Sequence, residues 1–292
     1  MRRSAYHRGA IVRLMLPLHN TLSRRLLLGS IAGLFVATAV PARPAAPAER
    51  QPVTPMTEAV KAELAPNGRL RAALNYSNFL LVSTRTPEHT GVAPDLAREL
   101  ARRANATVEF VGYDNAGLVA DAAANRAWDV AFIGAEPARA GEITFTPAYV
   151  EIEAGYLVPG NSKLWSVDDV DHEDVRIVTA ARAAYTLYLQ RTLRRATIVE
   201  ADGAQGAADR FGRENFDVMA GLMPRLLEDV QRMPATRIIP GRFTAVQQSI
   251  GVRKERAAAA AYLAAFADEI KTSGLLASLI QKHGARGLTI AK

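Results

Sequence analysis

The chain contains the same pattern of alternating strands and helices twice. In each copy, three predicted strands are separated by two predicted helices. The first copy has strands at 69–74, 107–111 and 128–134 with helices at 94–105 and 116–126, and the second has strands at 175–180, 197–199 and 216–221 with helices at 184–195 and 203–215. Two βαβαβ units of this length predict an α/β fold of two similar lobes with largely parallel sheets.

The two copies also agree in sequence detail. Trp128-Asp129-Val130 in the first copy matches Phe216-Asp217-Val218 in the second, and Gly134-x-x-Pro137 matches Gly221-x-x-Pro224. An interval of 18 positions separates the end of the middle strand from this Asp in both copies. Chance alternation within a single α/β domain is the alternative, and the equal spacing favours two lobes.

Two extended segments border the second copy and predict a hinge. Residues 145–161 and 243–253 are β-prone and lack helical periodicity. Strands at both positions would connect the lobes twice. The predicted organisation is an export signal peptide at 1–48, a linker at 49–66 that leads into a short helix, a first lobe of 67–156 plus 247–292 that includes a helical tail, and a second lobe of 157–246.

The first 48 residues have the three regions of an export signal. Six Arg and no acid come first, then an uncharged run from Leu26 to Val40, then an Ala- and Pro-rich stretch that contains the seventh Arg. The run is shorter than the roughly 20 residues that a membrane span needs, although a single-pass anchor stays an alternative. Ser23-Arg24-Arg25-Leu26 resembles a twin-arginine signal. The general secretory route, the cleavage site and a start at Met15 instead of Met1 stay open, and the mature protein is predicted to be periplasmic.

The net charge of +7 belongs entirely to this leader. The rest of the chain holds 29 basic and 29 acidic groups, so it gives no reason to expect a nucleic acid or an anionic membrane as a partner. The chain has no Cys, and the His residues outside the leader are far apart in sequence, so we predict no metal site. Glycine-rich phosphate-binding loops are absent from the sequence, and we predict no cofactor.

One arginine follows the third strand of the first copy. That strand ends at Gly134, and Arg139 lies just beyond it. Ligands of open α/β sheets bind beyond the carboxyl ends of the strands, and an arginine there can hold a carboxylate or phosphate with two hydrogen bonds. A solvent-exposed surface arginine is the alternative interpretation.

Four stretches together resemble family 3 of the bacterial extracellular solute-binding proteins, the kind that serve polar amino-acid uptake. These stretches are Gly68–Arg71, Gly91–Ala97, the block from Asp129 through Arg139 to Tyr149, and Val175–Val178. Their order and spacing extend the resemblance over nearly all of residues 68–292. It implies two lobes, a ligand in the cleft between them, hinge closure, and delivery to the membrane permease of an ABC transporter.

The resemblance also implies roles for individual residues. Arg139 matches the family's arginine for the ligand carboxylate, and Arg182 and Tyr185 stand where the second lobe's first helix contacts that carboxylate. Tyr76, Asn78 and Phe79 follow the first strand, where the family places an aromatic ring over the ligand. The remaining predicted ligand-binding residues are Gly134, Glu136 and Gln248.

Three departures from the family pattern bear on the ligand. Arg182 replaces the usual small residue. Ala220-Gly221-Leu222-Met223 contains no acid where amino-acid binders carry an Asp for the α-amino group, and Ile133–Pro137 replaces a Thr- and Ser-rich stretch. We therefore predict a small anionic or zwitterionic solute, with an anionic or less cationic one favoured over an ordinary α-amino acid.

The predicted protein is a monomeric binding protein and not an enzyme. Two alternatives stay open. One is a cleft enzyme of the same fold, resembling cyclohexadienyl dehydratases, in which Glu136 would be the acid or base. The other is a periplasmic sensory protein that presents the same closed lobes to a receptor.

Overall fold

The computed structural model describes residues 55–85 and 88–292. The predicted export signal, with its twin-arginine motif and cleavage site, lies outside the described residues. The strands are β1 Arg69–Asn75, β2 Thr107–Tyr113, β3 Val130–Gly134, β4 Ile143–Phe145, β5 Val150–Pro159, β6 Arg176–Ala180, β7 Thr197–Ala201, β8 Val218–Leu222, β9 Thr236–Ile238, β10 Thr244–Arg253 and β11 Thr289–Ile290. None of the described helices combines the length and apolarity that a membrane span requires.

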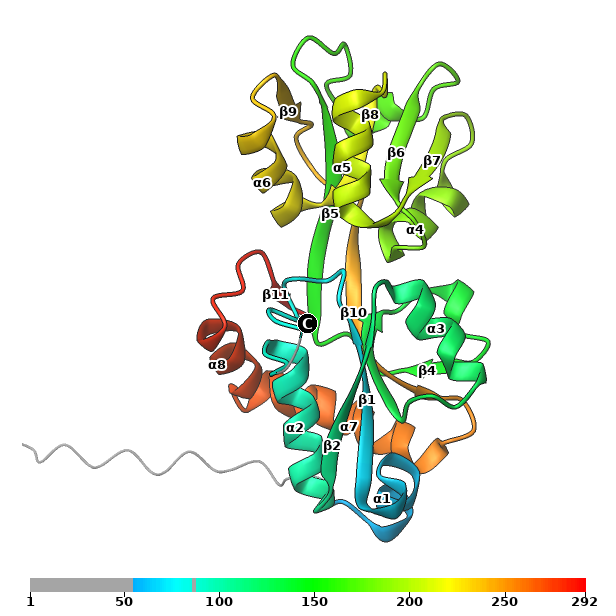
Figure 1. Cartoon of the computed structure of the whole chain (residues 1–292), viewed down its shortest axis with the longest axis vertical. Helices are drawn as coiled ribbons and strands as arrows, with labels where there is room; N and C mark the ends of the chain where they lie inside the picture. Colours follow the sequence, from blue (N-terminus) through cyan, green and yellow to red (C-terminus); the bar gives the residue numbers. More distant parts are fainter. Residues whose placement is uncertain (1–54, 86–87) are drawn as a thin grey trace, which may run out of the picture. The chain divides into compact units, whose positions relative to one another are not determined.

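The strand order confirms the predicted α/β fold of two lobes. The main path runs β2-β1-β3-β10-β5-β8-β6-β7. In the first lobe β1 pairs in parallel with β2 and β3, and in the second lobe β6 pairs in parallel with β7 and β8. The long strands β5 and β10 pair antiparallel with each other and run between the lobes, as the two extended segments predicted (Figure 1).

The first lobe combines the first repeat with α1 and with the segment that follows β10. Its helices are α1 Glu58–Leu64, α2 Val92–Ala104, α3 Ala116–Ala124, α7 Ala257–Thr272 and α8 Leu275–Lys282. The main apolar core lies between α2, α7 and the faces of β1 and β3. α1 falls within the segment predicted as a linker, and its Val60 and Leu64 are buried in that core.

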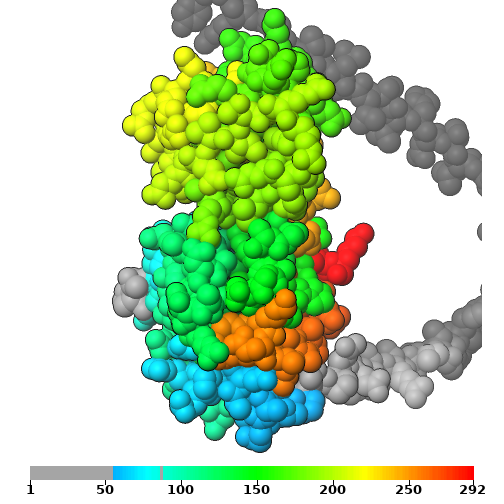
Figure 2. Space-filling view, turned by 90° about the vertical axis from the view of Figure 1, so that its right-hand side faces the viewer, coloured from blue at the N-terminus to red at the C-terminus, as the bar shows by residue number. Residues whose placement is uncertain are grey.

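The second lobe contains the second repeat. Its helices are α4 Ala184–Thr192, α5 Gly203–Arg213 and α6 Met223–Arg232. In Figure 2 its yellow and yellow-green residues lie above the blue, cyan, green and orange residues of the first lobe. Apolar clusters cover both faces of β6 and β8. No helix was predicted for the α6 segment, although a helix accepts proline in its first turn, where Pro224 lies.

The matching Asp of each repeat performs the same structural task. Asp129 Oδ2 accepts a hydrogen bond from the backbone N–H of Arg71 at 3.0 Å, and Asp217 Oδ2 accepts one from the backbone N–H of Arg176 at 2.9 Å. Each Asp thus fastens the start of its third strand to the central strand of its lobe. The repeat detected in the sequence is therefore a repeat of contacts as well as of elements.

The interlobe strands place their side chains in both cores. Val150 near the start of β5 packs in the first lobe's core, whereas Tyr156 and Val158 farther along it pack in the second lobe. A small apolar cluster lies where the strands cross between the lobes, and Val246 of β10 and Ala184 of α4 belong to it. The hinge strands therefore fix the place at which the two lobes meet.

Candidate functional site

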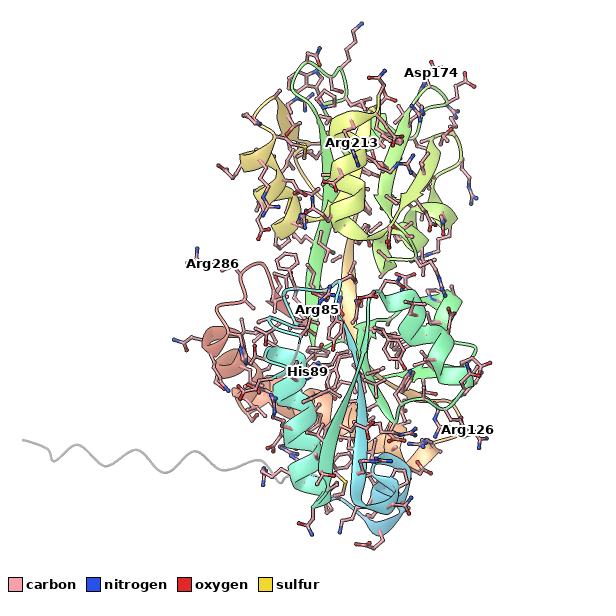
Figure 3. All side chains as sticks on the ribbon, viewed as in Figure 1. Arg85, His89, Arg126, Asp174, Arg213 and Arg286 are labelled. Atoms are coloured by element: carbon pink, nitrogen blue, oxygen red, sulfur yellow. The ribbon has the colours of Figure 1, made fainter. Side chains whose placement is uncertain are left out.

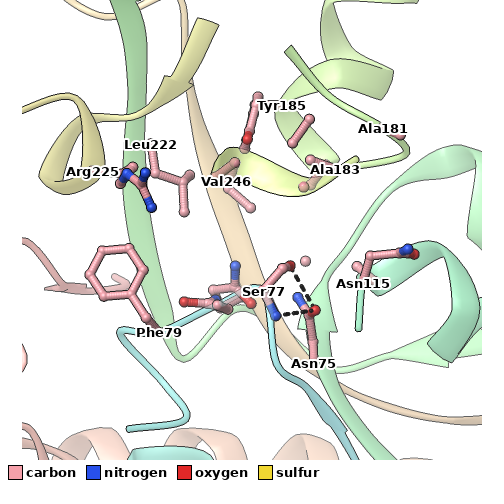
Figure 4. A pocket seen from close by; sticks show the side chains of 18 of the residues that line it. Asn75, Ser77, Phe79, Asn115, Ala181, Ala183, Tyr185, Leu222, Arg225 and Val246 are labelled. Carbon is pink, nitrogen blue, oxygen red and sulfur yellow. Dashed lines mark hydrogen bonds between the residues drawn. The ribbon is translucent and has the colours of Figure 1, made fainter. Parts of the chain in front are cut away.

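A cavity lies between the lobes at the carboxyl ends of β1, β3, β6 and β8. Segments from both repeats and from β10 line it, so no single lobe forms it alone (Figure 4). Its volume is about 50 Å³. One water needs roughly 10–15 Å³ on this measure, so the space admits only a few water-sized groups. Six of the nine residues predicted to bind ligand line this cavity: Asn78, Phe79, Gly134, Arg139, Tyr185 and Gln248.

Arg139 is the buried cation of this site. It ends a short 3₁₀ helix, Pro137–Arg139, and is only 5 % exposed. Its Nη1 donates to the Gly134 carbonyl at 2.5 Å, and its Nη2 donates across the cleft to the Arg182 carbonyl at 2.9 Å. Burial lowers the pKa of Arg139 to about 10, with the nearby Glu136 carboxylate opposing that shift. The guanidinium thus remains charged at neutral pH and forms no salt bridge with a described carboxylate.

Two carboxamides line the same cavity without hydrogen-bond partners among the described residues. Gln248 of β10 is 4 % exposed, and its Oε1 is buried without a hydrogen-bond donor. Asn78 is 5 % exposed, and its Oδ1 is also buried without a donor. Gln248 stands opposite Gly134 in the β10–β3 ladder, which places it beside the anchor of Arg139. Buried amides in native proteins are normally hydrogen-bonded, so two bare amides at one cavity indicate a place for a ligand.

The neighbouring polar groups already have partners. Asn75 Oδ1 accepts hydrogen bonds from the backbone N–H of Ser77 at 3.2 Å and from its hydroxyl at 2.8 Å (Figure 4). Asn115 Oδ1 caps α3 by accepting from the Leu118 backbone N–H at 3.0 Å. These side chains shape the floor of the cavity but offer fewer free groups than Asn78 and Gln248.

Arg225 is a cavity residue that sequence reasoning missed. It lies in the first turn of α6, and its Nε donates to both carboxylate oxygens of the buried Asp229, at 2.9 and 3.0 Å. Its Nη2 donates to Gln205 Oε1 at 2.7 Å. The repeat could have revealed it, because Arg225 comes directly after Gly221-x-x-Pro224 and Arg139 comes two residues after the proline of Gly134-x-x-Pro137. The residues that line the cavity thus include two arginines and no Asp or Glu.

Small and aromatic side chains complete the walls. Tyr185 of α4 is buried, and that burial raises the pKa of its hydroxyl, which stays neutral. Phe79 is partly exposed and reaches the cavity from the loop after β1. Gly134 allows the lobes to approach, because a Cβ there would lie 2.9 Å from both Ala184 Cβ and Val246 Cγ1. The site therefore combines one available cation, two free amides and close apolar walls.

Arg182, the unusual residue of the second lobe, points away from this cavity. Its backbone has φ 57°, in the left-handed region that favours glycine. Its guanidinium crosses to α3 of the first lobe, where Nη1 and Nη2 each donate to a carboxylate oxygen of Asp121 at 2.7 Å. Its backbone carbonyl, not its side chain, is what the buried Arg139 contacts.

Glu136 also lies outside the cavity lining. Its carboxylate is buried and accepts a hydrogen bond from Arg191 of α4. Burial raises the pKa of Glu136, and the attraction of Arg191 opposes that rise. Glu136–Arg191 and Asp121–Arg182 are therefore two ion pairs that join the lobes beside the cavity.

Tyr76, the third predicted residue that does not line the cavity, packs within the first lobe. Its hydroxyl forms a 2.7 Å hydrogen bond with Nε2 of His89, and the Arg85 guanidinium lies 4.9 Å from the centre of its ring. Arg85 and His89 both belong to the segment between β1 and α2 (Figure 3). This aromatic therefore supports the loop that carries Asn78 and Phe79.

The comparisons with known proteins agree with this architecture. The model of the family "Bacterial extracellular solute-binding proteins, family 3" matches residues 71–286. The chain belongs to this family. No curated protein matches its sequence. Family 3 membership makes the cavity between the lobes the site at which a solute is expected, and it makes transport the general role.

Solved structures share the fold at low sequence identity. A mutant of ArgBP from T. maritima is 19% identical with a TM-score of 0.64, and the match covers 78% of this chain and 100% of that one. An ancestral amino-acid-binding protein, described as a precursor of cyclohexadienyl dehydratase, is 20% identical with a TM-score of 0.63 over 76% and 98%. The substrate-binding protein AbpA from Streptococcus pneumoniae, bound to L-arginine, is 15% identical with a TM-score of 0.62 over 78% and 99%. The fold is that of the type II periplasmic binding proteins.

Proposed function

We propose that the protein captures a small carboxylate-bearing solute in this cavity and delivers it, as a periplasmic monomer, to the permease of an ABC transporter. The observation that carries the proposal is the state of Arg139. A guanidinium so deeply buried is costly unless a counter-ion or several acceptors surround it. Two backbone carbonyls satisfy only part of this fork, and a solute carboxylate would supply the missing charge.

Hinge closure links binding to delivery. Arg139 comes from the first lobe, Tyr185 and Arg225 from the second, and Gln248 from a strand that joins them. A solute that contacts all of them binds the closed arrangement better than an open one, so it shifts the population toward closed lobes. The ion pairs Asp121–Arg182 and Glu136–Arg191 favour the same arrangement. A permease that recognises both lobes in the closed form would then receive only loaded protein.

An enzyme of the same fold is the alternative, and the cavity chemistry favours binding over it. A dehydratase needs an acid or base within reach of its substrate. The described residues that line the cavity include no Asp, Glu, His or Lys, and Glu136 is held by Arg191 outside it. Turnover of prephenate or arogenate by the purified protein would support the enzyme instead. A sensory role uses the same closed lobes, and capture by a receptor in place of a permease would support it.

A thermal-shift screen tests the proposal directly. Purified protein is heated with amino acids, dicarboxylates, aromatic acids and phosphorylated metabolites, and hits are measured by calorimetry. Arg139→Ala should weaken binding of the carboxylate hit by at least about 100-fold, because it removes a buried charge-assisted pair. Arg213→Ala, an exposed arginine of α5, is the matched control and should bind normally. Equal thermal stabilisation of Arg139→Ala and the unmodified protein would contradict the carboxylate anchor.

A further inference from the structure

The charge balance of the cavity constrains the second polar group of the solute. Arg139 is available for a carboxylate, while Arg225 is already neutralised by Asp229, which does not itself line the cavity. An α-amino acid bound at Arg139 would place its ammonium group in this space, where none of the described lining residues carries a carboxylate. Burying an ammonium without a counter-ion is strongly unfavourable. A cationic group next to the solute carboxylate is therefore poorly accommodated.

Apart from the two arginines, the hydrogen-bonding groups that line the cavity are neutral. The amides of Asn78 and Gln248 can each donate and accept hydrogen bonds, and the oxygen of each is buried with no donor among the described residues. Gln248 is the ladder partner of Gly134, whose carbonyl anchors Arg139. A carboxylate held by Arg139 would thus bring the substituent on its neighbouring carbon toward the Gln248 amide. A hydroxyl or carbonyl oxygen is the partner that such an amide satisfies without any need for charge.

Resting on the proposed function, we propose that the solute is a short hydroxy- or oxo-carboxylic acid, bound in preference to the α-amino acid of the same shape. Arg139 holds the carboxylate, and Gln248, with Asn78, hydrogen-bonds the uncharged oxygen. The lack of an acid in the Ala220–Met223 segment then contributes to specificity, because no carboxylate of that segment can bind an ammonium group.

Matched solute pairs test this inference by calorimetry on the purified protein. L-lactate is compared with L-alanine, L-malate with L-aspartate, and 2-oxoglutarate with L-glutamate. Each pair keeps the carbon skeleton and exchanges a neutral oxygen for an ammonium group. In the best-bound pair, the hydroxy or oxo acid should bind at least about 10-fold more tightly than the amino acid. Equal or tighter binding of the amino acid overturns the inference.

A substitution that restores an acid gives the sharper result. Gln248→Glu adds a carboxylate of nearly the same size beside Arg139, so it should weaken binding of the hydroxy acid and strengthen binding of the amino acid, reversing the preference. Asn78→Asp is a second route to the same reversal if the first variant does not fold, and circular dichroism checks both. An unchanged preference in folded variants contradicts the role of these amides.

Different results would contradict the proposed carboxylate-binding function and the hydroxy-acid inference. If amino acids bind best and Arg139→Ala abolishes that binding, the carboxylate-binding function stands and the hydroxy-acid inference is wrong. If no carboxylate of any kind binds, the proposed function is wrong and the inference falls with it. Preference for the hydroxy or oxo acid, lost in Arg139→Ala and reversed in Gln248→Glu, supports both.

Discussion

Arg139 lies two residues after the Gly-x-x-Pro motif of the first lobe, and Arg225 lies one residue after the matching motif of the second. The two arginines differ in what holds them. Arg139 ends a short 3₁₀ helix, and among the described residues its only partners are backbone carbonyls. Arg225 begins the ten-residue helix α6, and one turn later that helix supplies Asp229 as a bidentate partner. The repeat thus brings an arginine to the cavity from each side. The longer helix of the second lobe neutralises its arginine, and the shorter one of the first lobe supplies its arginine with no carboxylate.

The largest expected effect on stability comes from breaking the Arg225–Asp229 ion pair of the second lobe. Asp229→Asn leaves Arg225 beside the cavity without a counter-ion, and breaking a mostly buried pair should lower the free energy of unfolding by about 3 kcal/mol. Urea denaturation measures this loss. Glu228→Gln, an exposed neighbour, removes the same charge and should change stability little.

The same variant should make the two lobes more alike in binding. With Arg225 released, the cavity would hold two free guanidinium groups, so a dicarboxylate should gain affinity relative to a monocarboxylate. Unaltered stability of Asp229→Asn, or an unaltered ratio of the two affinities in the folded protein, would show that Asp229 does not control Arg225.

The two lobes could be predicted from the sequence because the patterns that specify them lie within short segments. The periodicity of each element and the paired Asp129 and Asp217 motifs are properties of short segments, and the structure repeats them as contacts. The position of Arg139 followed from the same logic, since it lies just after a buried strand. Its binding of a solute carboxylate stays a prediction.

Side-chain direction across the cleft could not be predicted in this way. Arg182 turns toward Asp121 because α3 of the other lobe lies within reach, a fact that depends on how far the lobes approach. Glu136 is drawn to Arg191 for the same reason. Arg225 was missed because α6 was not predicted, and Arg225 lies in the first turn of that helix. Contacts between segments far apart in sequence decided each of these outcomes.

Substitutions at the two matching glycines, Gly134 and Gly221, distinguish an effect on lobe closure from an effect on packing within one lobe. A Cβ at Gly134 would lie 2.9 Å from Ala184 Cβ in the opposite lobe, whereas a Cβ at Gly221 would meet Leu226 of its own lobe at 3.0 Å. Gly134→Ala should therefore oppose lobe closure and weaken solute binding by about 10-fold, equivalent to about 1.4 kcal/mol. Gly221→Ala is the matched control and should affect stability more than affinity. Calorimetry for binding and small-angle scattering for closure distinguish the two, and equal losses of affinity would contradict this division.

The smallest effect concerns the second position after each glycine, which is Glu136 in the first lobe and the neutral Met223 in the second. Burial raises the pKa of Glu136 in the folded protein above its unfolded value of about 4.3. The folded state therefore binds this proton more tightly than the unfolded state does. The associated stability is fully present below the unfolded pKa and is lost as the pH rises through the folded pKa.

Glu136→Gln removes that titration and makes the first turn neutral like the second. The melting temperature of the variant, relative to the unmodified protein, should rise between pH 4 and pH 7 by no more than about 3 °C. Comparison at each pH cancels the other carboxyl groups, since both proteins carry them. Arg191 remains hydrated in the variant because it is partly exposed, so loss of its partner should not mask the trend. A relative melting temperature that falls as the pH rises would mean that the ion pair with Arg191 outweighs the burial of the Glu136 charge, and that the first lobe's turn is stabilised by its acid.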